Sequence, residues 1–334
     1  MRPVIALDAM GGDRAPAEIV AGAVRAATQL DVDILLVGQP DAIAPHLPDG
    51  VAPHGVEVLA ASEVIAMDDE PAAAVRAKKD SSLVVCARAV KEGRAQAMVG
   101  AGNTGATMAA ALLILGRVRG IDRPALCGML PVTSERRATC LLDAGATMDA
   151  DGRNLLQFAR MATAFMEKVH GVQRPLIGLI NVGEEPEKGD RLALEAHALL
   201  AGAEDLNFYG NIEGRDILRG ITDIALCDGF TGNVIAKTLE GAFDTLTNGI
   251  RGDIFGGPLG KVAGLIAMPG IRKFRGRFDY DPYVSAPLLG IAGVSVVTHG
   301  RAKADMMRWA IAVAERAVAT RLVDAIGTSA VPAA

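Results

Sequence analysis

The chain has 334 residues and a formal net charge of −5, from 39 acidic and 34 basic side chains. Half of its residues are hydrophobic and only 4% are aromatic. This composition excludes disordered and fibrous proteins, and the negative charge argues against a nucleic-acid-binding protein. We expect residues 1–334 to form one large α/β unit, or two lobes that divide near Arg174.

Short Val, Ile and Leu runs alternate with longer Ala-rich amphipathic stretches. This alternation is typical of βα units that build a buried, mainly parallel sheet. The expected strands are 4–7, 33–37, 56–59, 96–99, 125–130, 138–142, 176–180, 205–209, 224–227 and 293–297. The expected helices are 16–29, 71–78, 81–91, 104–115, 152–169, 189–200 and 305–323. The sequence therefore predicts a Rossmann-like, three-layer α/β/α fold.

Residues 234–280 depart from this alternation. Apolar residues recur there at helical spacing, and Gly256-Gly257-Pro258 and Pro269-Gly270 interrupt them. We therefore expect a protruding hairpin made of a long helix, a short kinked helix and a return.

The second half of this hairpin is basic, with five cationic and no acidic residues between Lys261 and Arg277. One interpretation is helix packing across a dimer. Another is contact of the tip with an anionic membrane, because apolar and basic side chains together suit a lipid interface. The two can coexist. The residues expected at the membrane are Leu259, Lys261, Val262, Leu265, Ile266, Arg272 and Lys273.

Three polar loops have the composition of anion-binding sites. Residues 8–13 (DAMGGD) and 100–106 (GAGNTGA) each follow an expected strand, and residues 78–82 (KKDSS) begin a helix. Glycine lets a ligand approach the backbone, and the amides at a helix N-terminus attract anions. Each loop alone could equally be a structural turn. The residues expected to bind phosphate or substrate are Asp8, Gly11, Gly12, Asp13, Lys79, Ser81, Ser82, Gly102, Thr104, Gly105 and Asp228.

Other sites find no support in the sequence. It contains no HExxH, GxSxG, dinucleotide or P-loop motif, and its four cysteines form no CxxC pair. No apolar stretch approaches the ~20 residues of a spanning helix, and the first residues lack the form of a secretion signal. We expect a cytoplasmic protein with reduced cysteines and without a metal or cofactor.

Nine motifs follow one another along the chain: IALDAMGGD, EVIAMDDEPAAAVRAKKDSS, GAGNTGA, LLDAGATMD, NVGEEPEKGD, NIEGRDI, CDGFTGNV, APLLGIAGV and THG. With them, the sequence resembles the phosphate acyltransferase (PlsX) family of bacterial phospholipid synthesis. The resemblance implies a fold like those of isocitrate dehydrogenase and phosphotransacetylase, a homodimer, and peripheral attachment to the membrane. It also implies a reaction in which acyl-acyl carrier protein and inorganic phosphate give acyl-phosphate and free carrier protein. A membrane glycerol-3-phosphate acyltransferase would consume the product.

Such a reaction needs no protein nucleophile, because phosphate can attack a thioester directly and a thiolate leaves readily. We expect Lys188 and the Gly102–Gly105 loop to hold phosphate, and Asn103 or Asn233 to lie near the carbonyl. His299 is a candidate general acid, although a lone histidine after a strand is often structural.

Three alternatives stay open. A phosphotransacetylase-like enzyme would use acyl-CoA, which carries the same phosphopantetheine arm as the carrier protein. Because the carrier protein is acidic, its enzyme should present a basic docking patch. A nicotinamide-dependent decarboxylating dehydrogenase of similar fold and a non-enzymatic, membrane-associated scaffold are the other two.

Overall fold

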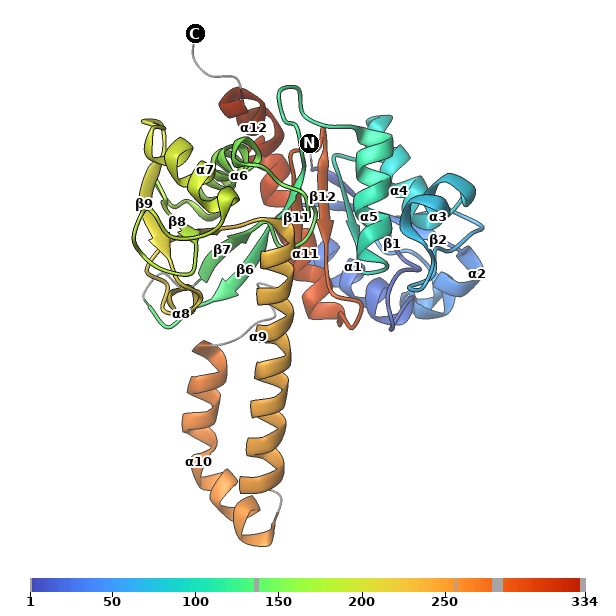
Figure 1. Ribbon diagram of the computed structural model, residues 1–334. Coiled ribbons are helices and arrows are strands. Elements are labelled where there is room, and N and C mark those ends of the chain that lie inside the picture. Colours follow the sequence, from blue (N-terminus) through green and yellow to red (C-terminus); the bar gives the residue numbers. More distant parts are fainter. Residues whose placement is uncertain (1, 135–137, 256, 278–284, 331–334) are drawn as a thin grey trace.

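The computed structural model describes residues 2–134, 138–255, 257–277 and 285–330 (Figure 1). Two β-sheets lie side by side, helices cover them, and a long helical hairpin projects from the body (Figure 1). In the part of the chain described, no helix is long and apolar enough to cross a membrane.

The first sheet has seven strands in the order β3-β2-β1-β4-β12-β11-β5. They are β1 (Val4–Asp8), β2 (Asp33–Gly38), β3 (Val56–Ala60), β4 (Ala97–Gly100), β5 (Ala125–Leu126), β11 (Ala286–Leu289) and β12 (Val294–Val297). The pairs are parallel except those made by β11, which is antiparallel to β12 and β5. The chain moves outward from β1 to β3 and then returns to place β4 on the other side of β1. At such a switch point the loops after the two strands diverge, and ligands bind in the crevice at the carboxyl ends.

The second sheet has five strands in the order β6-β7-β10-β8-β9. They are β6 (Gly128–Pro131), β7 (Ala138–Leu142), β8 (Leu176–Ile180), β9 (Asn207–Ile212) and β10 (Ile224–Leu226). Only β6 is antiparallel to its neighbour. Since β10 returns between β7 and β8, this sheet has its own switch point.

Helices cover both faces of each sheet, which confirms the predicted three-layer α/β/α arrangement with mainly parallel sheets. In β1, alternate residues point to opposite faces. Ile5 and Leu7 share one core with α1 and α11, while Ala6 shares another with α3, α4 and α5. In the second sheet α6 (Gly152–Phe165) covers one face and α9 (Gly229–Gly249) the other. The helices of the body are α1 (Ala17–Gln29), α2 (Pro40–Ile43), α3 (Pro71–Ala77), α4 (Ser82–Lys91), α5 (Thr104–Ala110), α6 (Gly152–Phe165), α7 (Arg191–Ala201), α8 (Gly214–Ile217), α11 (Ala304–Ala319) and α12 (Leu322–Ala330).

The projecting hairpin consists of α9 (Gly229–Gly249), a π-helical turn (Ile250–Ile254) and α10 (Pro258–Arg277). The predicted break at Pro269 is wrong, because Pro269 lies inside α10. A proline removes one backbone hydrogen bond, yet its fixed φ is helical, so a helix can bend and continue through it. The side chains of Lys261 and Lys273, and residues 278–280 of the expected hairpin, lie outside what the structure describes.

Other differences from the predicted elements occur where the chain changes sheet or direction. The expected strand 125–130 is two strands, β5 and β6, because the chain crosses between the sheets at Cys127. The second sheet therefore begins at Gly128. The expected helix 305–323 is interrupted, since Arg321 has a φ of 54° between α11 and α12. The sequence analysis also missed β11, which contains Pro287.

Candidate active site

The loops after β1 and β4 pack against each other at the switch point of the first sheet. A Cβ added to Gly11 would lie 2.9 Å from the backbone nitrogen of Gly102, and one on Gly102 would lie 3.1 Å from the Cα of Gly11. Gly12 has a φ of +104°, and the Asp13 amide donates to the Gly300 carbonyl at 2.8 Å. Three strand ends, those of β1, β4 and β12, thus meet at one place, with room only for glycine between them.

Asp8 lies beneath these loops and is only 4% exposed. Its carboxylate accepts hydrogen bonds from the Met10 amide at 3.1 Å and from the hydroxyl of Ser82, the first residue of α4. Burial raises the pKa of Asp8, and these bonds offset only part of the shift. A buried carboxyl with a raised pKa at a strand end is typical of functional sites.

The Asn103 side chain joins two segments of this region. Its Nδ2 faces the carbonyl oxygens of Met67 and Asp69 at 3.2 and 3.0 Å, and its Oδ1 accepts from the Ala106 amide at 3.0 Å. Both ends of the amide group are therefore engaged by the backbone. In this arrangement Asn103 caps α5 and positions the 66–69 loop.

The expected residues around the 78–82 loop separate into two sets. Ser81 and Ser82 are buried, and Ser81 caps α4 through the Val84 amide at 3.4 Å. Lys79 is exposed and lines a groove on the outer side of α3 and α4. Gly105 lies at the start of α5 against Pro71, and the neighbouring Thr104 is exposed.

His299 follows β12 and connects the first sheet to α9. Its Nδ1 accepts from the Arg301 amide at 3.2 Å, which leaves the proton on Nε2 to be donated to Glu240 Oε1 at 3.1 Å. Arg301 donates to the same oxygen at 2.9 Å, and Lys237 donates to Oε2 at 2.8 Å. Lys237 foremost, with His299, lowers the pKa of Glu240 to about 2. The sequence analysis missed Glu240, because no motif marks a carboxylate in mid-helix.

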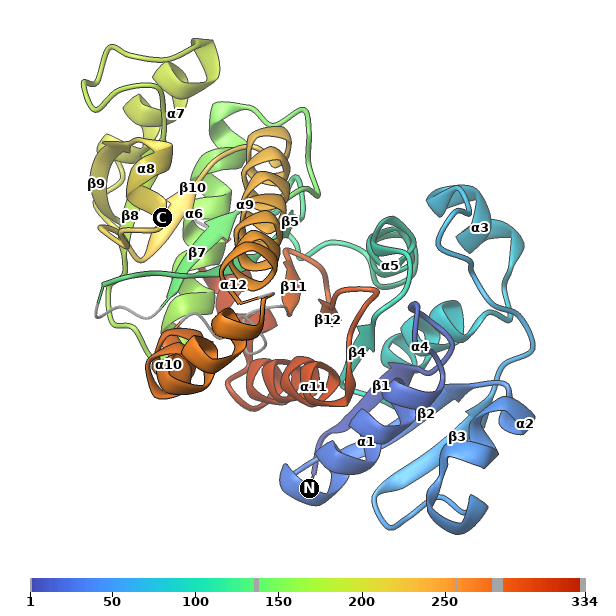
Figure 2. The same ribbon diagram turned by 90° about the horizontal axis from the view of Figure 1, so that it is seen from below.

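The first turns of α9 pack on the loop after β7. A Cβ on Gly232 would lie 1.8 Å from the Asp143 carbonyl oxygen, and Asn233 Nδ2 is 3.4 Å from the Ala144 carbonyl. Asp228 caps this helix, with Oδ1 2.6 Å from the Thr231 amide. Asn233 and Glu240 are seven residues apart, so they lie on one face of α9 about 10 Å apart along its axis. Helix α9 therefore links the loop edges of the two sheets (Figure 2).

Asp143, directly after β7 of the second sheet, is a buried acidic residue that was not predicted. It is fully buried, and its carboxylate accepts from the amides of Leu126, Gly145, Ala146 and Thr147 at 2.6 to 3.1 Å. Burial nevertheless raises its pKa. Asp143 organises the 143–147 loop on which Asn233 rests.

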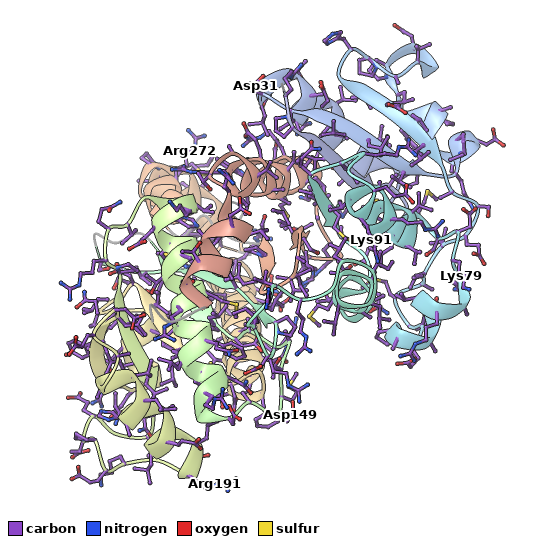
Figure 3. The ribbon with its side chains drawn as sticks, turned by 90° about the horizontal axis from the view of Figure 1, so that it is seen from above. Asp31, Lys79, Lys91, Asp149, Arg191 and Arg272 are labelled. Atoms are coloured by element: carbon purple, nitrogen blue, oxygen red, sulfur yellow. The ribbon has the colours of Figure 1, made fainter. Side chains whose placement is uncertain are left out.

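Lys188 lies in the loop between β8 and α7, on the second sheet. Asn181 donates to the Lys188 carbonyl at 2.9 Å, and the Lys188 amide donates to the Glu185 carbonyl at 3.1 Å. Its side chain is exposed, and no ion pair of its ammonium is described. Arg191, three residues further on, lies across the body from Lys79 (Figure 3). The expected residues thus form two groups, one at each sheet, with α9 joining them.

Among the residues that the structure describes, no group of three or more His, Cys, Asp or Glu side chains is placed to hold a metal ion. All four cysteines are buried as free thiols, as predicted. The glycine-rich loops offer backbone amides, which suit the binding of an anion and the stabilisation of an oxyanion.

Two open sheets with glycine-rich loops at a switch point place the chain in the phosphotransacetylase fold class. A branched-chain phosphotransacylase from Enterococcus faecalis superposes with a TM-score of 0.61 at 14% identity, covering 95% of this chain and 99% of that one. A phosphotransacetylase from Streptococcus pyogenes gives 0.60 at 17%, covering 95% and 94%. At these identities the likeness concerns the fold alone, and it confirms the predicted fold class.

A family model described as "Fatty acid synthesis protein" matches residues 3–324. The phosphate acyltransferase of Heliobacterium modesticaldum is 50% identical over 324 residues, which cover 96% of each chain. That of Desulfitobacterium hafniense is 47% identical over 323 residues, again with 96% of each covered. The chain belongs to this phosphate acyltransferase family, which confirms the resemblance and the predicted acyltransferase class.

Proposed function

We propose that the chain transfers the acyl group of an acyl-acyl carrier protein to inorganic phosphate. The product is acyl-phosphate for phospholipid synthesis, and the carrier protein is released with a free thiol. The observation that carries this proposal is the meeting of the loops after β1, β4 and β12 over Asp8 and Ser82. Such a site presents backbone amides to a small anion and admits no side chain at Gly11.

The proposed reaction is one displacement. A phosphate oxygen attacks the thioester carbonyl carbon, and the C–O bond forms as the carbonyl becomes an oxyanion. The C–S bond then breaks, and the electron pair leaves with sulfur as a thiolate, which needs little protonation near neutral pH. The enzyme contributes orientation and oxyanion stabilisation.

The proposed roles follow from the placement of each group. The amides of Gly12 and of residues 102–105 hold phosphate, with Asp8 and Ser82 fixing the loops. The Asn233 side-chain amide makes only a long hydrogen bond, 3.4 Å, to the Ala144 carbonyl. It is therefore available to donate to the carbonyl oxygen of the thioester. Because His299 Nε2 already donates to Glu240, we assign His299 to positioning rather than to acid catalysis.

Lys188 lies on the second sheet, so it could hold phosphate only at the boundary between the two loop edges. Lys188→Ala should raise the KM for phosphate by about tenfold, in line with the loss of one charged contact. Normal turnover and normal KM in this variant would remove Lys188 from the phosphate site.

The direct test of the reaction uses purified protein with palmitoyl-acyl carrier protein, with and without phosphate, and traps acyl-phosphate as its hydroxamate. We expect hydroxamate that depends on both enzyme and phosphate. A parallel reaction with palmitoyl-CoA shows which thioester is the better donor, and so tests the phosphotransacetylase-like alternative. No phosphate-dependent product from either donor would refute the proposal and favour the scaffold or dehydrogenase alternative.

We also propose a homodimer that attaches to anionic membrane through the hairpin, in the cytoplasm, where it supplies a membrane glycerol-3-phosphate acyltransferase. Support comes from apolar side chains that the hairpin leaves exposed. Leu259, Val262, Leu265 and Ile266 of α10 are 59 to 87% exposed, and Leu246 of α9 is 63% exposed. Exposed apolar surface of this extent marks a protein or lipid contact.

Arg272 stands about 20 Å further along α10 than Leu259. A hairpin that lies along the interface would bring both to the lipid, whereas end-on insertion would place only the tip in it. The double variant Leu265→Glu/Ile266→Glu should stop sedimentation with anionic vesicles at low salt. Retained sedimentation would contradict the lipid contact.

A further inference from the structure

A groove lies between α3, α4 and the π-helical turn that continues α5 (Ala111–Leu115), on the outer side of the first sheet. Its volume is about 570 Å³. The residues that line it are either apolar or cationic: Val75, Val84, Leu113 and Ile114, with Arg76, Lys79 and Arg88. No acidic side chain is among them.

The cations of this groove are available to a partner. Arg76, Lys79 and Arg88 are exposed, and no ion pair of Arg76 or Lys79 is described. Arg88 donates to the Lys79 carbonyl, which holds the two residues together. The nearby Asp80 carboxylate accepts from the Ser62 amide and hydroxyl at 2.9 and 2.6 Å and is also attracted to Arg88. Arg76 and Lys79 are therefore the cations most available to a partner.

The floor of the groove is apolar and partly open. Val75 and Val84 are buried beneath it, whereas the Leu113 side chain is 47% exposed. An apolar floor with a cationic rim is complementary to an acidic helix that carries a few apolar side chains. In a chain with a net charge of −5, a concave surface lined by cations without a carboxylate marks a specific contact.

The same elements connect this groove to the candidate active site. Helix α4 begins at Ser82, which bonds to Asp8, and reaches Arg88 about 9 Å further along its axis. Helix α5 begins beside the Gly102–Gly105 loop, and its continuation carries Leu113 and Ile114. A partner seated here would lie about 9 Å along α4 from Ser82, a span that a flexible prosthetic arm can bridge.

We propose that this groove docks the acidic acyl carrier protein whose phosphopantetheine arm delivers the thioester, an inference that rests on the proposed function. An anionic membrane is a poorer occupant. The groove is concave, and Lys79 at its rim lies far from Arg272 of the hairpin (Figure 3). Carrier docking and lipid contact therefore use different surfaces.

The test compares a protein donor with a protein-free one. In Arg76→Glu, the KM for palmitoyl-acyl carrier protein should rise about tenfold or more, because a rim cation becomes repulsive. The KM for palmitoyl-CoA should not change. Leu113→Asp should act in the same direction. Lys168→Glu, which reverses an exposed cation in the turn after α6, should leave both values at wild type.

Binding of the carrier without its acyl group separates this inference from the function it rests on. Holo-carrier protein should bind the wild type in fluorescence anisotropy, more weakly at high salt, and bind Arg76→Glu at least about tenfold more weakly. Equal binding to both would overturn the docking site even if the enzyme is active. An equal rise of KM for both donors would indicate that the groove is a general anion site. Loss of vesicle binding without a change in either KM would indicate that the groove contacts lipid. If the enzyme forms no acyl-phosphate but still binds the carrier protein in a way that depends on Arg76, the proposed reaction is refuted and the docking surface stands.

Discussion

Glu240 of α9 and His299 at the end of β12 meet at 3.1 Å between Oε1 and Nε2. One residue belongs to the helix that starts on the second sheet, and the other to the strand edge of the first. Their contact, with Arg301 on the same oxygen, sets the position of the two loop edges relative to each other. The account therefore predicts effects of Glu240 on both stability and turnover.

Glu240→Gln should lower the free energy of unfolding by about 1 kcal/mol at neutral pH, because Lys237, His299 and Arg301 lose their charged acceptor. Because the pKa of Glu240 is lowered to about 2, its stabilising contribution is complete above the ordinary value of 4.5 and is lost as pH falls through 2. Urea unfolding at several pH values should show a constant difference from wild type above pH 4.5. Asp244→Asn, whose nearest cation is 4.0 Å away, is the control and should have a smaller effect.

Two glycines of α9 should respond in opposite ways to alanine. Gly232→Ala places a Cβ 1.8 Å from the Asp143 carbonyl oxygen, so the helix must move, at a cost of about 3 kcal/mol or more. Gly241→Ala meets nothing within 4 Å and should stabilise the helix by about 0.5–1 kcal/mol. Thermal unfolding of both variants measures this. Similar melting temperatures would show that the first turn of α9 does not pack as described.

Gly11→Ala tests the glycine-rich loops as the phosphate site. The new Cβ would lie 2.6 Å from Asp8 Oδ2 and 2.9 Å from the Gly102 nitrogen, so the loops must separate. We expect the KM for phosphate to rise at least about tenfold, because the anion loses aligned amides. Gly214→Ala, which has open space, should leave it unchanged. An unaltered KM in a folded Gly11→Ala protein would place phosphate elsewhere.

Asp8 should link stability to pH with the opposite sign to Glu240. Because its pKa is raised from 3.8, its contribution is fully present below that value and is lost as pH rises through the raised pKa. Asp8→Asn removes this dependence. Chemical denaturation should therefore show the variant gaining stability relative to wild type between pH 3.8 and neutrality, while its activity falls. A difference that stays flat with pH would mean that Asp8 titrates as in water.

The parts that the sequence made predictable are those encoded locally. Val4–Asp8 and Ala138–Leu142 form strands because continuous apolar runs signal burial on both faces. The glycine-rich loops were predictable because a turn with Gly11 and Gly12 follows a strand and precedes a helix. The contact between the loops after β1 and β4 was not predictable, because which strand lies next to β1 depends on the whole sheet.

The parts that were missed depend on contacts between distant residues. Glu240 and His299 are 59 residues apart, and neither carries a local signal of the other. Asp143 looked like one more polar loop residue, yet packing against β5 and α9 buries it completely. The division into two sheets at Cys127 was hidden for the same reason: an apolar run does not show which sheet its residues join.

The central chemical claim is that phosphate attacks the thioester directly, with no acyl group on the protein. The most direct measurement is exchange of label between palmitoyl-acyl carrier protein and labelled holo-carrier protein, with enzyme present and phosphate absent. Direct attack predicts no exchange above the rate without enzyme, and rapid acyl-phosphate formation once phosphate is added. Enzyme-dependent exchange without phosphate would reveal a covalent acyl-enzyme and contradict the account.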